Sequence, residues 1–278
     1  PLGRDLRADH RADDGDEGRL QIVFQRIDRD TGLIADASTQ NAYFQPFIEG
    51  TEPHRSVSQH ESASEAQRAL LEDIRFHVNN ILSGMYSLSG QPDVAMFEYR
   101  VKFDEIFNPI SFGGVPDIRI IVVRGIPAVA MVRLPTAESD GKANLHKGGV
   151  GVGLDLVTGK TLSGMQNGKT TDIHPDTANP LRNFSVPHWD TMLEMAAKAY
   201  DVTGLGYLGA DIVLDKTKGP LLLELNARPG LAIQVANRIG IRPLLNATLK
   251  ADIEGLDALA RVELAKRLYR NHVPEPTF

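Results

Sequence analysis

The pattern of hydrophobic and polar positions predicts one long helix early in the chain. Between Ser62 and Tyr86, apolar residues recur at intervals of three and four positions, as in an amphipathic helix. Ser62 and Glu65 have the spacing of a capping box at its start. Gly84 or Gly90 marks its end.

Residues 1–62 lack this periodicity. They open with an acidic, glycine-containing stretch and hold two short apolar runs, Leu20–Phe24 and Tyr43–Ile48. We expect a hairpin or an irregular lobe here. The pattern thus predicts a divergent N-terminal lobe over 1–62, in which Pro1-Leu2-Gly3 is typical of a tag scar, and a second region over 63–278.

Short apolar runs of strand length follow the helix, separated by turns that contain glycine. The predicted strands are 94–103, 118–123, 128–134, 150–156, 208–214 and 221–225. The predicted later helices are 189–202, 232–239, 243–249 and 256–269. Gly125-Ile126-Pro127 predicts an antiparallel hairpin, and the prolines between 167 and 187 predict a polar loop, either a lid or a surface excursion. Antiparallel strands beside helices indicate an α+β fold.

Composition narrows the classes of function. Lys and Arg number 30 against 36 Asp and Glu, and this net charge of -6 gives no general attraction for a nucleic-acid backbone. Cysteine is absent, which excludes disulfides, thiolate catalysis and cysteine-ligated metals. No apolar run reaches the roughly 18 residues that span a bilayer, and no leader pattern opens the chain. We expect a cytoplasmic protein with no nucleic-acid partner and no membrane span, and leave a homo-oligomer open.

Two carboxylates and an amide are predicted to meet near the C-terminal end. A hairpin about the turn Asp215–Gly219 sets Asp211 opposite the end of the next strand, where Glu224 and Asn226 share a face. Their hard oxygen atoms suit Mg²⁺ shared with nucleotide phosphates, unless they are merely solvated. The leucines around Glu224 predict a buried strand, where charges are costly unless paired or metal-bound. Arg228 follows, placed for a carboxylate, a phosphate or a structural salt bridge.

These residues resemble the magnesium-binding end of the ATP-grasp superfamily, in particular the alpha-L-glutamate ligase-like branch that includes ribosomal-protein-modifying ligases. The similarity extends from Leu70 to Ala236. It implies an ATP-grasp-like α+β fold with antiparallel or mixed sheets, flanking helices and a reduced or divergent N-terminal part. The similar blocks, in order, are 98–100, 117–119, 142–149, 207–213 and 219–231.

The resemblance implies an ATP-dependent carboxylate-amine ligase. Such an enzyme transfers the γ-phosphoryl group of ATP to a carboxylate and lets an amine attack the acyl-phosphate, which yields an amide and ADP. The implied cofactors are ATP and two Mg²⁺ ions, for which Mn²⁺ can substitute. The implied substrates are an amino acid, glutamate or a related one, and a peptide or protein that supplies the other group.

The resemblance also assigns nucleotide contacts. Glu98 and Tyr99 would meet the adenine through backbone groups, and Asp117 would lie near the ribose or the substrate. The stretch Val101 to Pro116 is longer than in the ribosomal-protein-modifying ligases, so Asp104 or Glu105 is an alternative ribose contact.

A second group of matched residues would serve the phosphates. Lys142 and Asn144 would reach the triphosphate and the acyl-phosphate oxygens, with the N–H groups of Gly148-Gly149 as further donors. The alternative for Lys142 is an exposed loop cation.

Three cations are implied in catalysis. Arg133, Arg228 and Lys142 would neutralise charge during phosphoryl transfer. Arg119 and Arg228 would bind a substrate carboxylate. The alternative for Arg119 is an ion pair with an acidic residue of the core.

One feature of the family is missing from the sequence. Nothing matches the glycine-rich loop, flanked by two lysines, that covers the α- and β-phosphates, and the first 60 residues contain no lysine. A non-catalytic nucleotide-binding or scaffolding homologue is therefore the alternative to a ligase.

Overall fold

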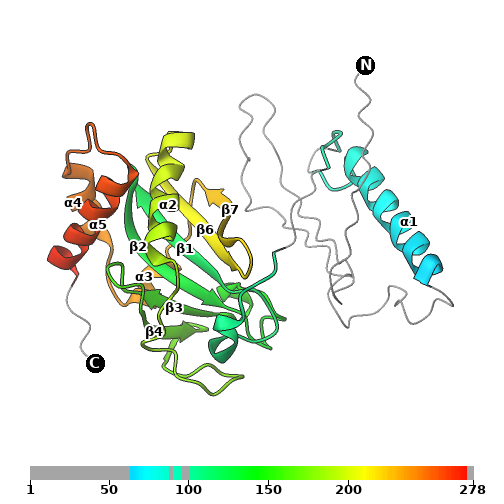
Figure 1. The fold of residues 1–278 in the computed structure, drawn as a ribbon, viewed down its shortest axis with the longest axis horizontal. Helices are drawn as coiled ribbons and strands as arrows, with labels where there is room; N and C mark the ends of the chain where they lie inside the picture. Colours follow the sequence, from blue (N-terminus) through cyan, green and yellow to red (C-terminus); the bar gives the residue numbers. More distant parts are fainter. Residues whose placement is uncertain (1–62, 88–89, 96–100, 274–278) are drawn as a thin grey trace. The chain divides into compact units, whose positions relative to one another are not determined.

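The computed structural model describes residues 63–87, 90–95 and 101–273 (Figure 1). The chain divides into two units, 1–100 and 101–278, which are described separately. The expected adenine contacts and the apolar runs before residue 62 lie outside the described residues, and the domain boundary at residue 63 stays a prediction. No described helix is both long enough and apolar enough to cross a bilayer.

The predicted long helix of the first unit is confirmed as α1 (Ala63–Leu82). After it, Gly84 adopts a left-handed conformation with φ of 78°. A Cβ atom there would lie 2.2 Å from the carbonyl oxygen of Gln91, so the tight turn requires glycine. The strand predicted over 94–103 is wrong for the residues of this range that the structure describes, 94–95 and 101–103. Within them, Phe103 alone forms an isolated bridge, with Asp215.

The second unit is built on a seven-stranded antiparallel sheet, which confirms the α+β class. The strand order is β5-β4-β3-β2-β1-β6-β7. The strands are β1 (Asp117–Val123), β2 (Ile126–Leu134), β3 (Val150–Leu154), β4 (Thr161–Gln166), β5 (Lys169–Thr171), β6 (Tyr207–Asp215) and β7 (Gly219–Asn226). Sequence reasoning missed β4 and β5, and β5 lies inside the predicted polar loop.

The predicted β1–β2 hairpin is confirmed, with Val123 in register with Ile126. Arg124 and Gly125 form its two-residue turn, both with positive φ (51° and 78°), which matches the twist of antiparallel strands. Every residue of β1 is buried except the partly exposed Arg119. The hairpin therefore provides the centre of the sheet.

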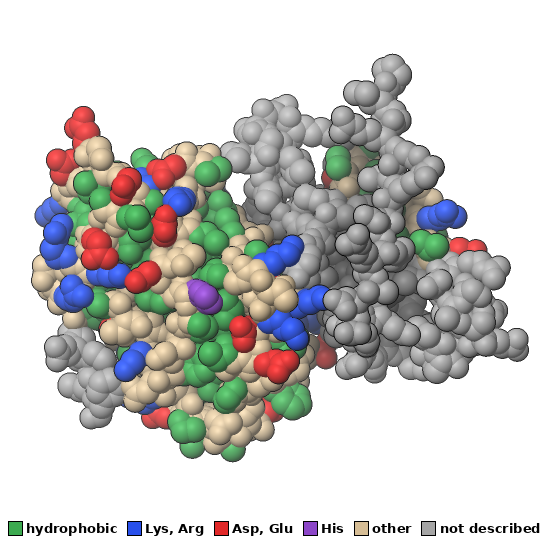
Figure 2. Space-filling view, viewed as in Figure 1, with side chains coloured by type: hydrophobic (Ala, Val, Ile, Leu, Met, Phe, Trp, Pro, Cys, Tyr) green, Lys and Arg blue, Asp and Glu red, His purple; other side chains and the backbone are tan. Residues whose placement is uncertain are grey.

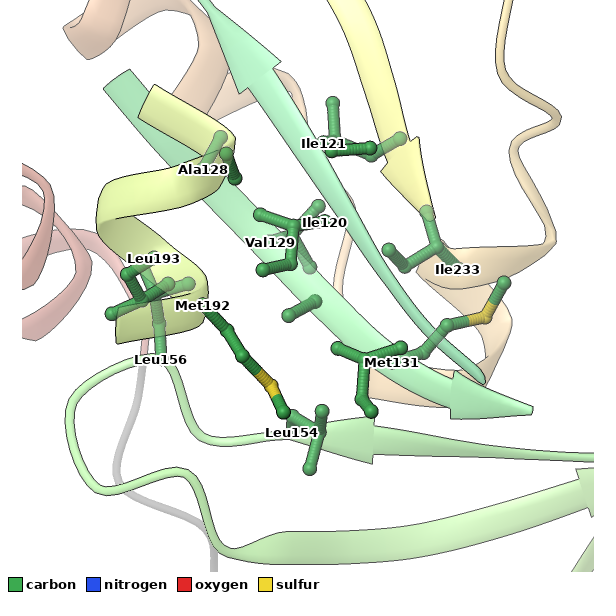
Figure 3. Packing of buried hydrophobic residues seen from close by; sticks show 14 of the residues in the cluster. Ile120, Ile121, Ala128, Val129, Met131, Leu154, Leu156, Met192, Leu193 and Ile233 are labelled. Atoms are coloured by element: carbon green, nitrogen blue, oxygen red, sulfur yellow. The ribbon is translucent and has the colours of Figure 1, made fainter. Parts of the chain in front are cut away.

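Helices cover both faces of the sheet (Figure 1). They are α2 (Trp189–Thr203), α3 (Ala232–Asn237), α4 (Arg242–Lys250) and α5 (Ala258–His272), with short 3-10 helices η3 (Glu105–Ile110) and η4 (Leu145–Lys147). Met192 of α2 lies beside Leu154 on one face (Figure 3). On the other face, a Cβ atom at Gly153 would lie 2.7 Å from the carbonyl oxygen of Ala236, so glycine lets α3 approach β3 closely.

The surface of the second unit carries both signs of charge. On the face shown in Figure 2, acidic and basic side chains are interspersed rather than gathered in one basic stripe.

His174 attaches the proline-containing loop to the end of β2. Its Nδ1 accepts hydrogen bonds from the backbone N–H groups of Asp176 and Thr177, both at 3.3 Å, so Nε2 carries the proton and donates to the Pro135 carbonyl at 3.0 Å. The side chain is fully buried. This part of the loop is therefore fixed to the sheet, while its role as a lid stays a prediction.

A histidine in this environment makes stability depend on pH. Burial lowers the pKa of His174 below its ordinary value near 6.5. The unfolded chain then binds the proton more readily, so the unfolding free energy falls as pH drops below about 6.5. We expect His174→Asn to lose about 1–2 kcal/mol at pH 7 and to show a weaker pH dependence between pH 7 and 5. Chemical denaturation at several pH values measures both.

The exposed His146 provides the control. His146→Asn is expected to retain both the stability and the pH dependence of the wild type. Equal pH profiles for wild type and His174→Asn would show that the buried ring does not govern the acid response.

Candidate functional site

Charged side chains gather on one face of the sheet where β2, β1, β6 and β7 run side by side. They come from two hairpins, β1–β2 and β6–β7, that are distant in sequence but adjacent in strand order. Because in-register residues of neighbouring strands point to the same face, the register alone places them together. The six residues are Asp117, Arg119, Arg133, Asp211, Glu224 and Asn226.

The register builds this group from cross-strand pairs. Asp117 of β1 lies opposite Arg133 of β2, and Arg119 of β1 lies opposite Asp211 of β6. Asp211 in turn lies opposite Glu224 of β7, as the predicted hairpin required. The register therefore sets two pairs of opposite charge side by side, Arg133 with Asp117 and Arg119 with Asp211, and adds a third carboxylate, Glu224, on β7.

Asp211 is the centre of the network. Nε of Arg119 donates to Oδ1 at 2.7 Å, and its Nη2 donates to Oδ2 at 2.5 Å. Oδ2 also accepts from Nη2 of Arg133 at 2.8 Å and from Nδ2 of Asn226 at 3.3 Å. The side chain is only 2% exposed. Burial alone would raise its pKa, but the hydrogen bonds and charges of the two arginines hold the pKa of Asp211 below its usual value.

Arg133 bridges two aspartates. Its Nε and Nη2 donate to the two carboxylate oxygens of Asp117 at 2.5 and 2.8 Å, in addition to the bond to Asp211. Burial, with the nearby negative charge of Asp211, raises the pKa of Asp117 to about 6, although Arg133 opposes this shift. Burial opposes the charge of Arg133, yet the two carboxylates raise its pKa above the usual value. Both oxygens of Asp117 are thus engaged by protein, which leaves its expected contact with the ribose a prediction.

Glu224 lies at the edge of the sheet. Its Oε1 accepts a hydrogen bond from Nδ2 of Asn226 at 3.1 Å. Burial and the negative charge of Asp211 raise the pKa of Glu224. The expectation of a buried strand is wrong here, because β7 is the last strand of the sheet and Leu222 and Leu223 are 39% and 40% exposed. The burial argument for a metal therefore applies to Asp211 on β6.

Lys142 and Arg228 are not joined to this network. Nζ of Lys142 lies 3.3 Å from Oδ2 of Asp140. Arg228 lies directly beyond β7 and is exposed. Among the described residues, no salt bridge to Arg228 is found, which was the alternative to a role in binding. The roles expected for both cations in phosphate or carboxylate binding remain predictions.

The predicted phosphate-binding turn satisfies its own hydrogen bonds. Asn144 caps η4, where its Oδ1 accepts from the N–H of His146 at 2.9 Å. The N–H groups of Gly148 and Gly149 donate to the carbonyls of Leu145 and Asn144. Both N–H groups thus already have backbone partners within the turn, and their expected contact with phosphate stays a prediction.

Sequence reasoning missed Glu138, which lies against Gly148 of this turn and binds the β4–β5 hairpin. Its Oε1 accepts from Nδ2 of Asn167 at 2.8 Å, and its Oε2 accepts from Nε2 of Gln166 at 3.2 Å. Gly148, with φ of 95°, leaves room for the carboxyl group, since a Cβ atom there would lie 2.6 Å from Cγ of Glu138. No local pattern identifies such a residue, because its partners lie about 30 positions away.

A comparison with known families found a match over much of the chain. Residues 53–250 match the family model described as sugar-transfer associated ATP-grasp. No curated protein matches the chain. The matched range includes all six residues of the charged network and supports the ATP-grasp superfamily expected from the sequence. The alpha-L-glutamate ligase-like branch is not confirmed.

Proposed function

We propose that this chain, which belongs to the sugar-transfer associated ATP-grasp family, uses ATP and Mg²⁺ to activate a carboxylate for attack by an amine. The observation that carries the proposal is the convergence of Asp211, Glu224 and Asn226 with two arginines on one face of the sheet. A site of this kind combines hard oxygen ligands for a divalent cation with cations for phosphate oxygens.

The donor set fits Mg²⁺ by its chemistry. Asp211, Glu224 and Asn226 offer carboxylate and amide oxygens, which suit Mg²⁺ better than zinc or copper. Among the described residues, no group of three His, Cys, Asp or Glu side chains could hold a metal ion, so we assign the remaining positions to the Asn226 amide, water and nucleotide phosphate. Mg²⁺ commonly binds through one or two carboxylates together with substrate phosphates. When bound, the ion would neutralise phosphate charge and orient the γ-phosphoryl group.

The chain's own residues would position the reactants. Arg119 and Arg133 present planar guanidinium groups whose N–H atoms match the oxygens of a phosphate or a carboxylate. The bidentate pair with Asp117 holds Arg133 in place, so this guanidinium loses little order when charge develops, whereas the described hydrogen bonds of Arg119 go to Asp211. Lys142 lies on the neighbouring turn after β2, which suits it to the outer phosphates.

The proposed reaction consists of two transfers. A carboxylate oxygen attacks the γ-phosphorus of ATP and ADP leaves; an amine then attacks the acyl carbon, and phosphate leaves with loss of the amine proton. Glutamate or a related amino acid is one candidate substrate. The association of the family with sugar transfer also favours uronic acids as the carboxylate and amino sugars as the amine, because each carries the group that this chemistry requires.

Thermal stabilisation by nucleotide tests the metal assignment. We expect Mg·ATP to raise the melting temperature of the wild type and Glu224→Gln to lose at least half of this shift, because the amide cannot supply a charged ligand. Differential scanning fluorimetry with and without Mg²⁺ gives the measurement. Glu194→Gln, which alters a carboxylate paired with Lys198 on the surface of α2, is the matched control and is expected to keep the full shift. A full shift in Glu224→Gln would remove Glu224 from the metal site.

A second function, nucleotide binding without turnover, rests on the missing lysine-flanked loop and on the turn that uses its own N–H groups. A screen for ADP release over amino acids, uronic acids, amino sugars and acidic peptides separates the two. The ligase proposal expects ADP release that depends on Mg²⁺ and on a carboxylate–amine pair. Saturable ATP binding with no ADP under any pair would favour the sensor or scaffold.

A further inference from the structure

We propose that Arg119 keeps Asp211 from binding a divalent cation until nucleotide phosphate draws its guanidinium away. This inference rests on the proposed function and adds an order to it: phosphate binds first, and Asp211 becomes a metal ligand afterwards. Arg119 is then a positioning residue that couples the two ligands. The argument depends on the hydrogen bonds of Asp211, on the second partner of Arg133 and on the charge of the network.

The oxygens of Asp211 are almost fully used. A carboxylate offers about four lone-pair sites. Arg119 occupies one on each oxygen, at 2.7 and 2.5 Å, and Arg133 and Asn226 both donate to Oδ2. Oδ2 therefore has three donors and Oδ1 has one, so a cation that binds Oδ2, or both oxygens together, must displace a donor. Displacing Arg119 removes a donor from both oxygens, whereas displacing Arg133 or Asn226 removes one from Oδ2 only.

The two arginines are held differently. Arg133 makes a complete bidentate pair with Asp117 and would keep it after losing Asp211. The hydrogen bonds that the described structure gives Arg119 all go to Asp211. The Arg119 side chain is 13% exposed, so an incoming anion can reach it. A phosphate group matches the planar guanidinium as well as a carboxylate does, and can therefore replace Asp211 as its partner.

The charge balance points the same way. Two arginines face three carboxyl groups, Asp117, Asp211 and Glu224, so the network carries a charge of about -1 when all are ionised. Moving Arg119 onto a phosphate leaves about -2 around Asp211, which attracts a divalent cation more strongly. Phosphate and metal thus favour each other, and such coupling is reciprocal.

Metal binding without nucleotide provides the test. We expect Arg119→Met to bind Mn²⁺ at least tenfold more tightly than the wild type when no nucleotide is present, as measured by electron paramagnetic resonance of free Mn²⁺ with the full chain. The same variant is expected to bind adenylyl imidodiphosphate at least fivefold more weakly in EDTA. Opposite changes for the two ligands are diagnostic, because simple damage to the fold would weaken both.

Two further variants complete the test. Arg182→Met removes an arginine from a surface pair with Asp172 and is expected to match the wild type within twofold for both ligands. Arg119→Lys keeps the charge but cannot span both oxygens of Asp211, so its affinity for Mn²⁺ is expected to rise by less than that of Arg119→Met. If Arg119→Met does not fold, Arg119→Lys provides the test in its place.

The outcomes separate this inference from the proposed function. If the wild type binds Mn²⁺ with adenylyl imidodiphosphate but neither Arg119 variant gains affinity for Mn²⁺ alone, the blocking role of Arg119 is wrong and the proposed function stands. If the wild type shows no saturable Mn²⁺ binding even with the nucleotide, both fail.

Discussion

Asp211→Asn is expected to abolish stabilisation by Mg·ATP and to lower the unfolding free energy by about 3–5 kcal/mol. The asparagine oxygen can serve only some of the donors that now reach Asp211, and its NH₂ group would face the N–H atoms of an arginine. Arg119 and Arg133 would then be left partly buried without full compensation. Urea denaturation and nucleotide-dependent melting measure the two effects independently.

Asp215→Asn is the matched control on the same strand. Asp215 is also buried, yet its pKa stays below the usual value, because it accepts hydrogen bonds from the hydroxyl of Thr217 and from the backbone N–H groups of Thr217, Lys102 and Lys218. Its substitution is expected to lower the unfolding free energy by about 1–3 kcal/mol but to leave the Mg·ATP shift intact. Retention of the full shift in Asp211→Asn would contradict the central place of Asp211 in the metal site.

Trp189→Ala is expected to reduce the unfolding free energy by about 3–5 kcal/mol without changing the site. Trp189 begins α2 on the face of the sheet opposite the charged network, where its Nε1 donates to the Leu156 carbonyl at 2.9 Å. Its ring packs beneath Gly159, at which a Cβ atom would lie 2.5 Å from Cγ of the indole. The substitution therefore creates a cavity and leaves a buried carbonyl unpaired.

Circular dichroism is the suitable measurement, because the chain contains a single tryptophan and the variant loses that fluorescence signal. Val202→Ala, at an exposed position near the end of the same helix, is expected to stay within about 0.5 kcal/mol of the wild type. A folded Trp189→Ala protein below its melting temperature is expected to bind Mg·ATP as the wild type does. Loss of binding in that state would show that α2 supports the site across the sheet.

The resemblance and the hairpin pattern were sufficient to select the residues that meet on β6 and β7. A turn at Asp215–Gly219 and the alternation of side chains place Asp211 opposite Glu224, and both depend on local sequence. The long helix, the β1–β2 hairpin and the four later helices were likewise predictable, because periodicity and turn residues act over a few positions. Strand β4, whose pairing with β3 contains a register shift, had no comparable local signal.

Tertiary structure decided the electrostatic state of the site. From the sequence, Arg119 had two alternatives, a substrate carboxylate or an acidic partner in the core. The strand order placed β6 beside β1, and this non-local pairing gave Arg119 the carboxylate of Asp211. The same strand order put β7 at the edge, which exposed leucines that the sequence pattern predicted to be buried.

The sequence by itself determined which side chains carry the chemistry and which of them share a strand face. The first follows from residue type, and the second follows because successive side chains of a strand point to opposite faces. Only the tertiary structure decided which charges neutralise each other and which hydrogen-bonding groups are already used. Those properties depend on strand order, burial and contacts between residues about 80 to 90 positions apart, as between Asp211 and its two arginines. Local sequence patterns contain no information on contacts between residues so far apart along the chain.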